Sequence, residues 1–235
     1  MRIDDVLIRY GQVARSKVKK IVKQGRVTVD GKVIAMVNYQ VDSNLNEVKL
    51  DGQHLTFPAH QYLMLNKAIR TLSANRDKQL PVVFDGLSQE VDRDSLYIIG
   101  RLDFLSQGLM LITDNGKLGR NLLKPEAHVK KVYAVETKEA LSTDAVDKFA
   151  SGLVIDGHVQ LAPAQLVLTS PHSAIVTISE GKNRQIRKMF LSIGVLVTQL
   201  VRKEIGPIQL DEALAPGEYR RLTQSEIKAL SIYFN

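Results

Sequence analysis

The apolar positions near the N-terminus first follow the period of a helix. Four of them fall on one stripe of a short helix that ends at Gly11: Ile3, Val6, Leu7 and Tyr10. Ser16 can cap a second helix, whose buried face holds three more apolar residues: Val18, Ile21 and Val22. Residues 26–29 and 32–34 then alternate as two strands around an Asp-Gly turn at 30–31. The pattern therefore predicts two short helices followed by a hairpin.

Beyond residue 60 the pattern changes to short β-rich runs. Residues 52–60 contain Pro58 and break the periodicity, so we expect a linker there. Six runs are predicted as strands: 62–65, 96–99, 109–113, 132–136, 166–168 and 175–178. Three stretches are predicted as helices: 140–151, 183–192 and 224–232, the last with a Thr223–Glu226 capping box.

These elements predict an α+β fold in two domains. Residues 1–58 are expected to form a small N-terminal α/β module with its linker. Residues 59–235 are expected to form a larger domain on a mixed, largely antiparallel sheet with flanking helices, because loops intervene without regular βαβ spacing.

Positive charge is concentrated in the first 50 residues. The chain carries a net charge of +7, and residues 1–50 hold ten basic and five acidic side chains. On the second predicted helix, three lysines lie opposite the apolar face, near Arg15 and Arg26: Lys19, Lys20 and Lys23. This asymmetry favours a polyanionic partner, because each phosphate neutralised releases counterions. Simple solvation of a lysine-rich face explains the same pattern, so charge alone does not establish RNA binding.

The composition excludes several kinds of chemistry. The chain has no cysteine, which rules out disulfides, thiolate nucleophiles and zinc–cysteine sites. The five histidines show no paired-ligand spacing, so we expect no metal and no cofactor. No apolar stretch approaches the roughly 20 residues that cross a bilayer, and the N-terminus lacks the apolar segment of a signal peptide. We therefore expect a soluble, cytoplasmic protein with no membrane partner, whose chemistry uses carboxylates, hydroxyls and basic groups.

One loop is a good candidate for that chemistry. Residues 100–116 read GRLDFLSQGLMLITDNG, which predicts a loop with Arg101 and Asp103 between two strands, then an Asp-Asn-Gly turn. A loop fixed between core strands can present one acid rigidly. The alternative is that Asp103 is a turn residue paired with Arg101, and the pattern alone favours that alternative.

The N-terminal segment resembles the S4 RNA-binding module over about 48 residues. The matching positions are Arg2-Ile3-Asp4, Gly11, Arg15-Ser16, Val18, Ile21, Gly25, Val27, Val29, Asp30-Gly31 and Val33. Many RNA-binding proteins with different activities share this module. The resemblance therefore implies RNA contact and no particular reaction.

The loop at 100–116 resembles the signature loop of the pseudouridine synthases, most closely the RsuA-like family, whose members modify ribosomal RNA. In that family the aspartate of the loop is the essential catalytic carboxylate, which corresponds to Asp103. The arginine before it, Arg101, is expected to help hold the target nucleotide and the RNA backbone open. The resemblance runs from residue 2 to about 228.

Three later segments agree with this family in order and spacing. The run KVYAV at 131–135 implies that Tyr133 lies beneath the target base. In EGKNRQIRKMF at 180–190, Arg187 is expected to pair with the catalytic aspartate, while Lys182 and Arg184 meet RNA phosphates. In LVRKEIGP at 200–207, Leu200 is expected to pack in the pocket. Taken without the resemblance, a core or edge-strand tyrosine is the favoured explanation of the first segment, and a solvated basic helix explains the second.

The sequence departs from the family pattern in two places. Residues 66–70 read NKAIR where the family usually has Asn-Lys-Pro-x-Gly, which puts the local turn in doubt. The signature loop has Ser106 where threonine is usual, and Gln107 where a small hydroxyl or glutamate is common.

The implied reaction converts one uridine to pseudouridine in ribosomal RNA, most closely the small-subunit 16S rRNA. The spelling of residues 183–185, Asn-Arg-Gln, is closer to large-subunit 23S relatives and leaves that alternative open. A non-catalytic RNA-binding assembly factor and a hydrolase with Asp103 as nucleophile are alternatives from other classes. We expect a monomer that acts on ribosomal RNA or on an assembly intermediate.

Overall fold

The computed structural model describes residues 1–234, which divide into two compact units. The first unit contains Met1–Gln61 together with the residues from Thr223 onward, and the second contains Tyr62–Leu222. No helix in the described part of the chain is long and apolar enough to cross a membrane.

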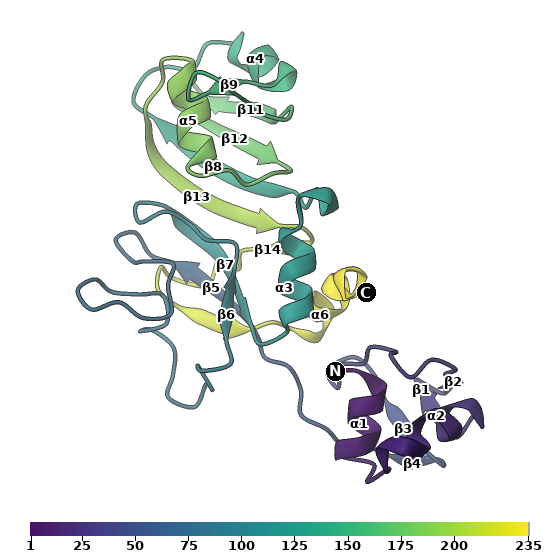
Figure 1. Ribbon diagram of the computed structural model, residues 1–235. Coiled ribbons are helices and arrows are strands. Elements are labelled where there is room, and N and C mark those ends of the chain that lie inside the picture. Colours follow the sequence, from purple (N-terminus) through teal and green to yellow (C-terminus); the bar gives the residue numbers. More distant parts are fainter. Residues whose placement is uncertain (235) are drawn as a thin grey trace. The chain divides into compact units, whose positions relative to one another are not determined.

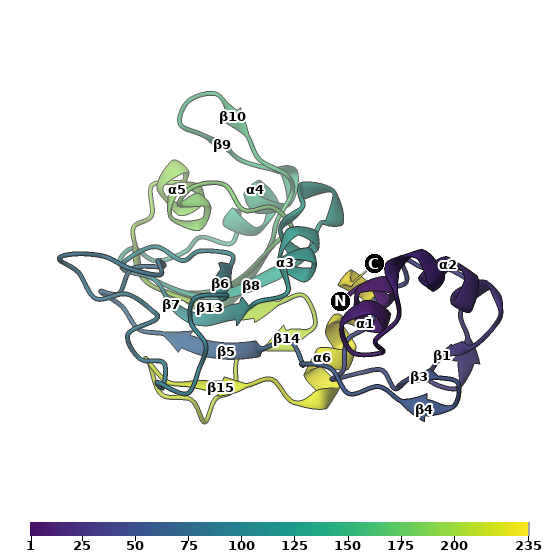
Figure 2. The ribbon, with the colours of Figure 1, turned by 60° about the horizontal axis from the view of Figure 1, so that its bottom comes forward.

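The first unit places two short helices on a small antiparallel sheet (Figure 2). Helix α1 spans Ile3–Arg9 and α2 spans Arg15–Lys23. The strands occur in the order β2-β1-β3-β4: Lys32–Val33, Val27–Val29, Val48–Leu50 and Gln53–His54. The predicted apolar stripes are buried, with Ile3, Val6 and Leu7 fully enclosed. Helix α6 (Gln224–Leu230) and a 3-10 turn (Ser231–Tyr233) also belong to this unit.

The second unit is built on a nine-stranded mixed sheet (Figure 1). Its main strands occur in the order β11-β12-β8-β13-β7-β5-β15: Gln165–Ser170, Ser173–Ile178, Lys131–Thr137, Val197–Ile205, Gln107–Thr113, Tyr62–Lys67 and Tyr219–Arg221. Strand β14 (Ile208–Gln209) pairs with β13, and β6 (Tyr97–Ile99) pairs with β7. Only β13 and β7 run parallel among these described pairs. The predicted α+β class with a largely antiparallel sheet is confirmed.

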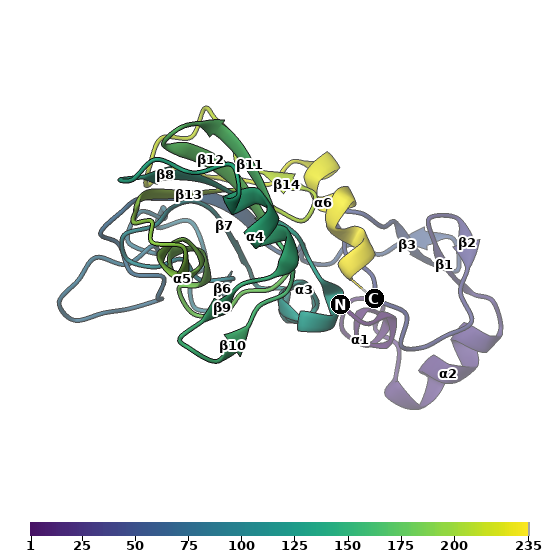
Figure 3. The same cartoon turned by 90° about the horizontal axis from the view of Figure 1, so that it is seen from above.

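Two helices cover one face of the β11–β8 half of this sheet (Figure 3). They are α4 (Ala145–Ser151) and α5 (Gln185–Ser192), and their rings Phe149 and Phe190 lie 5.1 Å apart in the core. A hairpin of β9 (Val154–Ile155) and β10 (Val159–Gln160) lies beside α5 (Figure 2). Helix α3 (Gly116–Leu123) and a 3-10 turn (Pro125–Ala127) follow β7.

Several local predictions are wrong in detail. Ser16 lies inside α2, and the cap position is Ala14, which makes no side-chain hydrogen bond. The predicted Asp-Asn-Gly turn instead starts α3, because the Asn115 side chain accepts from the Leu118 amide and caps a helix there. The helix predicted at 140–151 begins only at Ala145. The capping box of α6 is present as predicted.

Candidate active site

The candidate catalytic loop joins β6 to β7. Asp103 lies in its middle and is partly exposed, whereas Leu102 and Ser106 on either side are buried. At the end of the loop, Gly108 stands opposite Arg202 of β13, where the two parallel strands pair. A Cβ atom on Gly108 would lie 2.3 Å from the Arg202 carbonyl oxygen, so only glycine permits this approach.

Every backbone carbonyl of the loop from residue 100 to residue 106 accepts a hydrogen bond. The donors are four side chains and two backbone amides drawn from separate parts of the unit. In chain order the bonds are Arg202 to Gly100 (2.8 Å), Arg202 to Arg101 (3.5 Å), Ser73 to Leu102 (2.6 Å), the Ser106 amide to Asp103 (3.0 Å), the Arg70 amide to Phe104 (2.7 Å), Arg187 to Leu105 (3.0 Å) and Lys67 to Ser106 (2.8 Å). The loop is therefore held in one conformation without help from a ligand.

Two of these donors are cations buried beneath the loop. Arg202 is 2% exposed, and its Nε atom also donates to the Leu109 carbonyl at 2.7 Å. Lys67 is fully buried at the end of β5, and its Nζ atom donates to Ala68 and Ser106 and, at 3.5 Å, to Phe104. Burial lowers the pKa of Lys67 to about 8; the negative charge of Asp103 opposes that shift, and the charge of Arg202 adds to it.

Arg187 reaches the same loop from α5. Its guanidinium donates to the Leu105 carbonyl and to the Val197 carbonyl of β13, each at 3.0 Å. Burial lowers the pKa of Arg187, while the nearby Asp103 carboxylate raises it. Within residues 1–234 no ion pair joins the two groups, so the predicted direct pair is replaced by an interaction through space. The two terminal nitrogens of Arg187 donate to backbone carbonyls instead.

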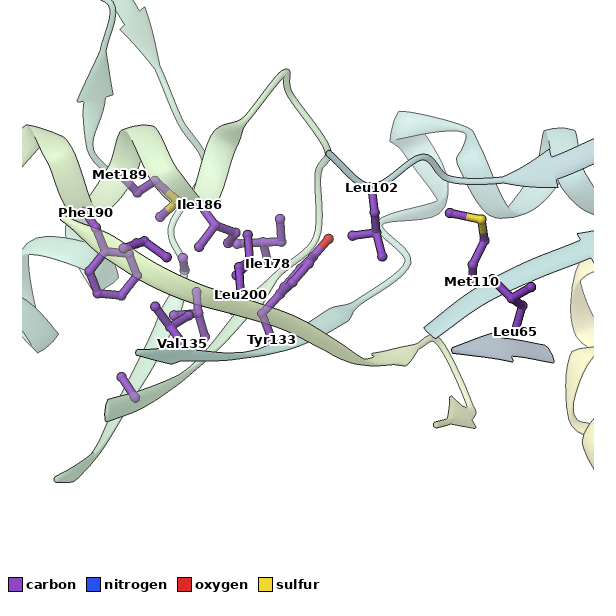
Figure 4. Close-up of a cluster of buried hydrophobic side chains, with 14 of the residues drawn as sticks. Leu65, Leu102, Met110, Tyr133, Val135, Ile178, Ile186, Met189, Phe190 and Leu200 are labelled. Carbon is purple, nitrogen blue, oxygen red and sulfur yellow. The ribbon is translucent and has the colours of Figure 1, made fainter. Parts of the chain in front are cut away.

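Tyr133 and Leu200 lie in the hydrophobic core next to this loop. Tyr133 is on β8 and is 7% exposed, Leu200 is on β13 and is 5% exposed, and both belong to the cluster that contains Leu102. Figure 4 shows the Tyr133 ring beside Leu200 and Ile178, with its hydroxyl directed toward the segment that carries Leu102. A flat ring with its polar end toward the loop is suited to contact a planar base.

The predicted RNA contacts differ in their availability. Arg101 and Arg184 are exposed, and Arg184 lies just before α5 with a left-handed backbone. Lys182 instead donates to the Gln160 carbonyl at 2.8 Å. On α2 the predicted basic residues are all exposed: Arg15, Lys19, Lys20 and Lys23. Arg26 is engaged with Asp51 at 2.5 Å.

No role is predicted from the sequence for Lys67, Arg202 or Ser73, although all three donate hydrogen bonds to the loop. Lys67 and Arg202 both lie in segments that resemble the family. Each is a cation next to apolar strand residues, and such a cation is rarely buried in a protein core. That placement is a usable signal for a buried, hydrogen-bonded group. Ser73 lies outside every quoted motif, and only the fold brings it to the Leu102 carbonyl.

Comparison with known proteins identifies the family of the chain. A family model described as RNA pseudouridylate synthase matches residues 61–192, and an S4 domain model matches residues 1–46. The uncharacterized RNA pseudouridine synthase YtzG of Bacillus subtilis (strain 168) is 37% identical over 235 residues, covering 98% of each chain. Ribosomal small subunit pseudouridine synthase A of Yersinia pestis is 36% identical over 232 residues, again 98% of each. A crystal structure of a pseudouridylate synthase matches with a TM-score of 0.70 and 31% identity, over 98% of this chain and 99% of that one.

An RNA pseudouridylate synthase model together with an S4 domain model identifies an RNA-modifying enzyme. The family match extends over more than half of the chain, and the relatives match along nearly its whole length. The chain belongs to the RNA pseudouridine synthase family, and the resemblance to its RsuA-like members is confirmed.

Proposed function

We propose that this enzyme isomerises one uridine of small-subunit (16S) ribosomal RNA to pseudouridine, with Asp103 as the catalytic carboxylate. The observation that carries the proposal is the exposure of Asp103 and the positive charges near it. The carboxylate is partly exposed on an immobilised loop, with Lys67 and Arg187 close enough to act on it electrostatically. Its oxygens form no ion pair within the described residues, so they are available to a substrate.

The reaction needs little beyond such a carboxylate. The N1–C1′ bond of uridine breaks, the uracil turns, and C5 bonds to C1′, so the base is neither oxidised nor reduced. An ionised carboxylate near C1′ either attacks that carbon or stabilises its positive charge and removes the 2′ proton. Both routes use the anionic form of the carboxylate.

We assign the remaining site residues by their position. Tyr133 contacts the uracil face, where stacking contributes roughly 1–3 kcal/mol. Leu200 forms an apolar wall of the same pocket. Exposed Arg101 and Arg184, with Lys182, bind phosphates around the extruded nucleotide, whose release from its helix costs a few kcal/mol.

The choice of the small subunit is supported by the relatives. Ribosomal small subunit pseudouridine synthase A of Yersinia pestis matches along 98% of both chains. We propose that residues 1–58, within the first unit, bind RNA and that the second unit, Tyr62–Leu222 within the predicted range 59–235, carries the reaction of a cytoplasmic monomer. Mapping pseudouridine in both ribosomal RNAs of a strain lacking the gene tests the target: one site in 16S rRNA should be lost, and a loss in 23S rRNA instead would refute the small-subunit assignment.

The catalytic role of Asp103 is tested by tritium release from RNA that carries 5-tritiated uridine. Asp103→Ala is expected to abolish release while RNA affinity stays within about threefold, because the carboxylate acts on the sugar and not on phosphates. Asp147→Asn, which changes an exposed carboxylate on α4, is the matched control and should leave release unchanged. Residual release by Asp103→Ala would show that another group carries the chemistry, and RNA binding without release by the unaltered protein would identify a non-catalytic assembly factor.

A further inference from the structure

The candidate catalytic loop exposes an apolar side chain beside its acid. Leu105 is 53% exposed and lies two residues after Asp103, while Arg101, two residues before it, is also exposed. Ile69 is 53% exposed as well, and it precedes Arg70, whose amide is bonded to the Phe104 carbonyl. The loop thus presents apolar surface to solvent at the place where a nucleotide must approach Asp103.

An exposed leucine on a mobile loop would not indicate a binding role, but the backbone at Leu105 is held by hydrogen bonds. The Leu105 carbonyl accepts from Arg187 at 3.0 Å, and its neighbours Phe104 and Ser106 accept from the Arg70 amide and from Lys67. Binding therefore does not have to order the backbone of this part of the chain, which already directs the Leu105 side chain to solvent.

The surroundings of Leu105 suit a polyanion. The Arg187 guanidinium donates to the Leu105 carbonyl itself, and Arg101 and Arg70 are exposed residues on the loop and on the segment bonded to it. The acidic residue of this loop is Asp103. Phosphates on either side of an extruded nucleotide find guanidinium groups there. An apolar tip within a basic rim is the chemistry of a side chain that enters between bases.

We propose that Leu105 is a wedge that occupies the gap left in the RNA stack when the target uridine is extruded. This inference rests on the proposed function and adds a positioning residue to it. Extrusion leaves two base faces open to water, and an inserted leucine covers them and delays return of the uridine. Leu105 touches no reacting atom, so its effect should depend on whether the target uridine starts in a paired helix.

The test compares two RNAs of identical sequence around the mapped target uridine. In the first the uridine is paired in a stem, and in the second the opposite strand is omitted. The measured quantity is the ratio of kcat/KM on paired RNA to kcat/KM on unpaired RNA. Leu105→Asn, similar in size but polar, is expected to lower this ratio about tenfold, because only the paired target needs a wedge. Leu105→Thr should lower it similarly, and Leu105→Met should keep it within about twofold of the original value.

Val167→Asn on edge strand β11 is the control, because Val167 is another exposed apolar residue of the same unit, 47% exposed. It should leave the ratio unchanged. A ratio for Leu105→Asn and Leu105→Thr within about twofold of the unaltered enzyme overturns the wedge, including the case where both RNAs lose activity equally. Absence of pseudouridine in both RNAs with the unaltered enzyme would instead refute the proposed function.

Discussion

At the scale of single residues, Lys67 joins the stability of the fold to the chemistry of the site. Its ammonium is fully buried, and its three hydrogen bonds all go to backbone carbonyls, two of them in the loop that carries Asp103. Burial disfavours the charged form, which is why its pKa falls to about 8 from the usual 10.5. Lys67 therefore places a positive charge near Asp103 at neutral pH and loses that charge as the pH rises through about 8.

This placement predicts opposite trends for activity and stability above pH 8. As Lys67 loses its proton, the positive charge near Asp103 disappears, so kcat should fall up to tenfold per pH unit. The folded pKa lies below the unfolded value, so the folded state binds fewer protons between pH 8 and 10.5, and Lys67 adds to stability as pH rises through that window. Single-turnover rates and urea unfolding over pH 7–10 measure the two trends.

Lys67→Met separates this effect from other titrating groups. Without the amine, the fall in kcat above pH 8 should disappear, and the rate should already be at least tenfold lower at pH 7 because the loop carbonyls lose their donor. Lys148→Met, at an exposed lysine of α4, should change neither profile. An alkaline limb that persists in Lys67→Met would assign it to a different residue.

At the scale of elements, the parallel pairing of β7 with β13 holds the end of the candidate catalytic loop. Gly108 and Arg202 face each other there, with Gly108 at a φ of +111°. Gly108→Ala places its new Cβ within 2.3 Å of the Arg202 carbonyl oxygen, and backbone must move to relieve the clash. We expect a loss of unfolding free energy of about 2–5 kcal/mol from overpacking and backbone strain together.

Gly157→Ala is the matched control for Gly108→Ala. Gly157 also has a positive φ, +76°, but no atom lies within 4 Å of a Cβ placed on it. That variant should lose only about 1 kcal/mol from the left-handed backbone. Equal losses in urea unfolding for the two variants would show that the approach of β7 to β13 is not tight.

Elements formed by regular patterns could be predicted, whereas those defined by distant partners could not. The stripes of α1 and α2 and the apolar run of β5 follow simple periods and are found where expected. Strand β13 was missed because register shifts between Val197 and Gln199 and between Arg202 and Glu204 break its alternation. Helix α3 could not be predicted, because Gly116 and Gly119 are typical of a turn. Gly119 is needed because the helix packs against Tyr97: a Cβ atom on Gly119 would lie 2.6 Å from the Tyr97 ring.

The candidate site shows the same division. Asp103, Tyr133 and Arg187 could be named from motifs that resemble a family, and the structure brings Arg187 onto the loop that carries Asp103. Which atoms Arg187 binds could not be predicted, because the choice between a carboxylate and two carbonyls depends on the distance from α5 to β13. The seven hydrogen-bonded carbonyls of the loop likewise depend on six positions between residues 67 and 202, too scattered for any sequence period.

At the scale of the whole molecule, the proposed function assigns RNA attraction and chemistry to different regions of the sequence. Helix α2 carries five exposed basic side chains and no acidic one: Arg15, Lys17, Lys19, Lys20 and Lys23. The buried cations of the second unit, Lys67 and Arg202, are committed to the loop and cannot serve phosphates. Affinity and turnover should therefore respond to different substitutions.

The double variant Lys19→Gln, Lys20→Gln tests this separation. It should weaken RNA binding and lower the magnitude of the slope of log K against log salt concentration by about 1.4–1.8, since each lost phosphate contact removes roughly 0.7–0.9. The kcat at saturating RNA should stay within about twofold, because no group near Asp103 changes. Binding titrations from 50 to 300 mM salt and single-turnover rates provide the two measurements.

Lys138→Gln, Lys148→Gln removes the same charge from the second unit and is the control for that double variant. If α2 binds phosphates directly, the control should leave the salt slope nearly unchanged, because long-range attraction is screened within about 10 Å at 0.1 M salt. Equal slope changes in the two variants would mean that only net charge matters, and an unchanged slope in both would mean that the lysine face of α2 is simply solvated. The slope thus decides between the two interpretations of the basic N-terminal region that its sequence leaves open, because solvation requires no released counterion and phosphate contact does.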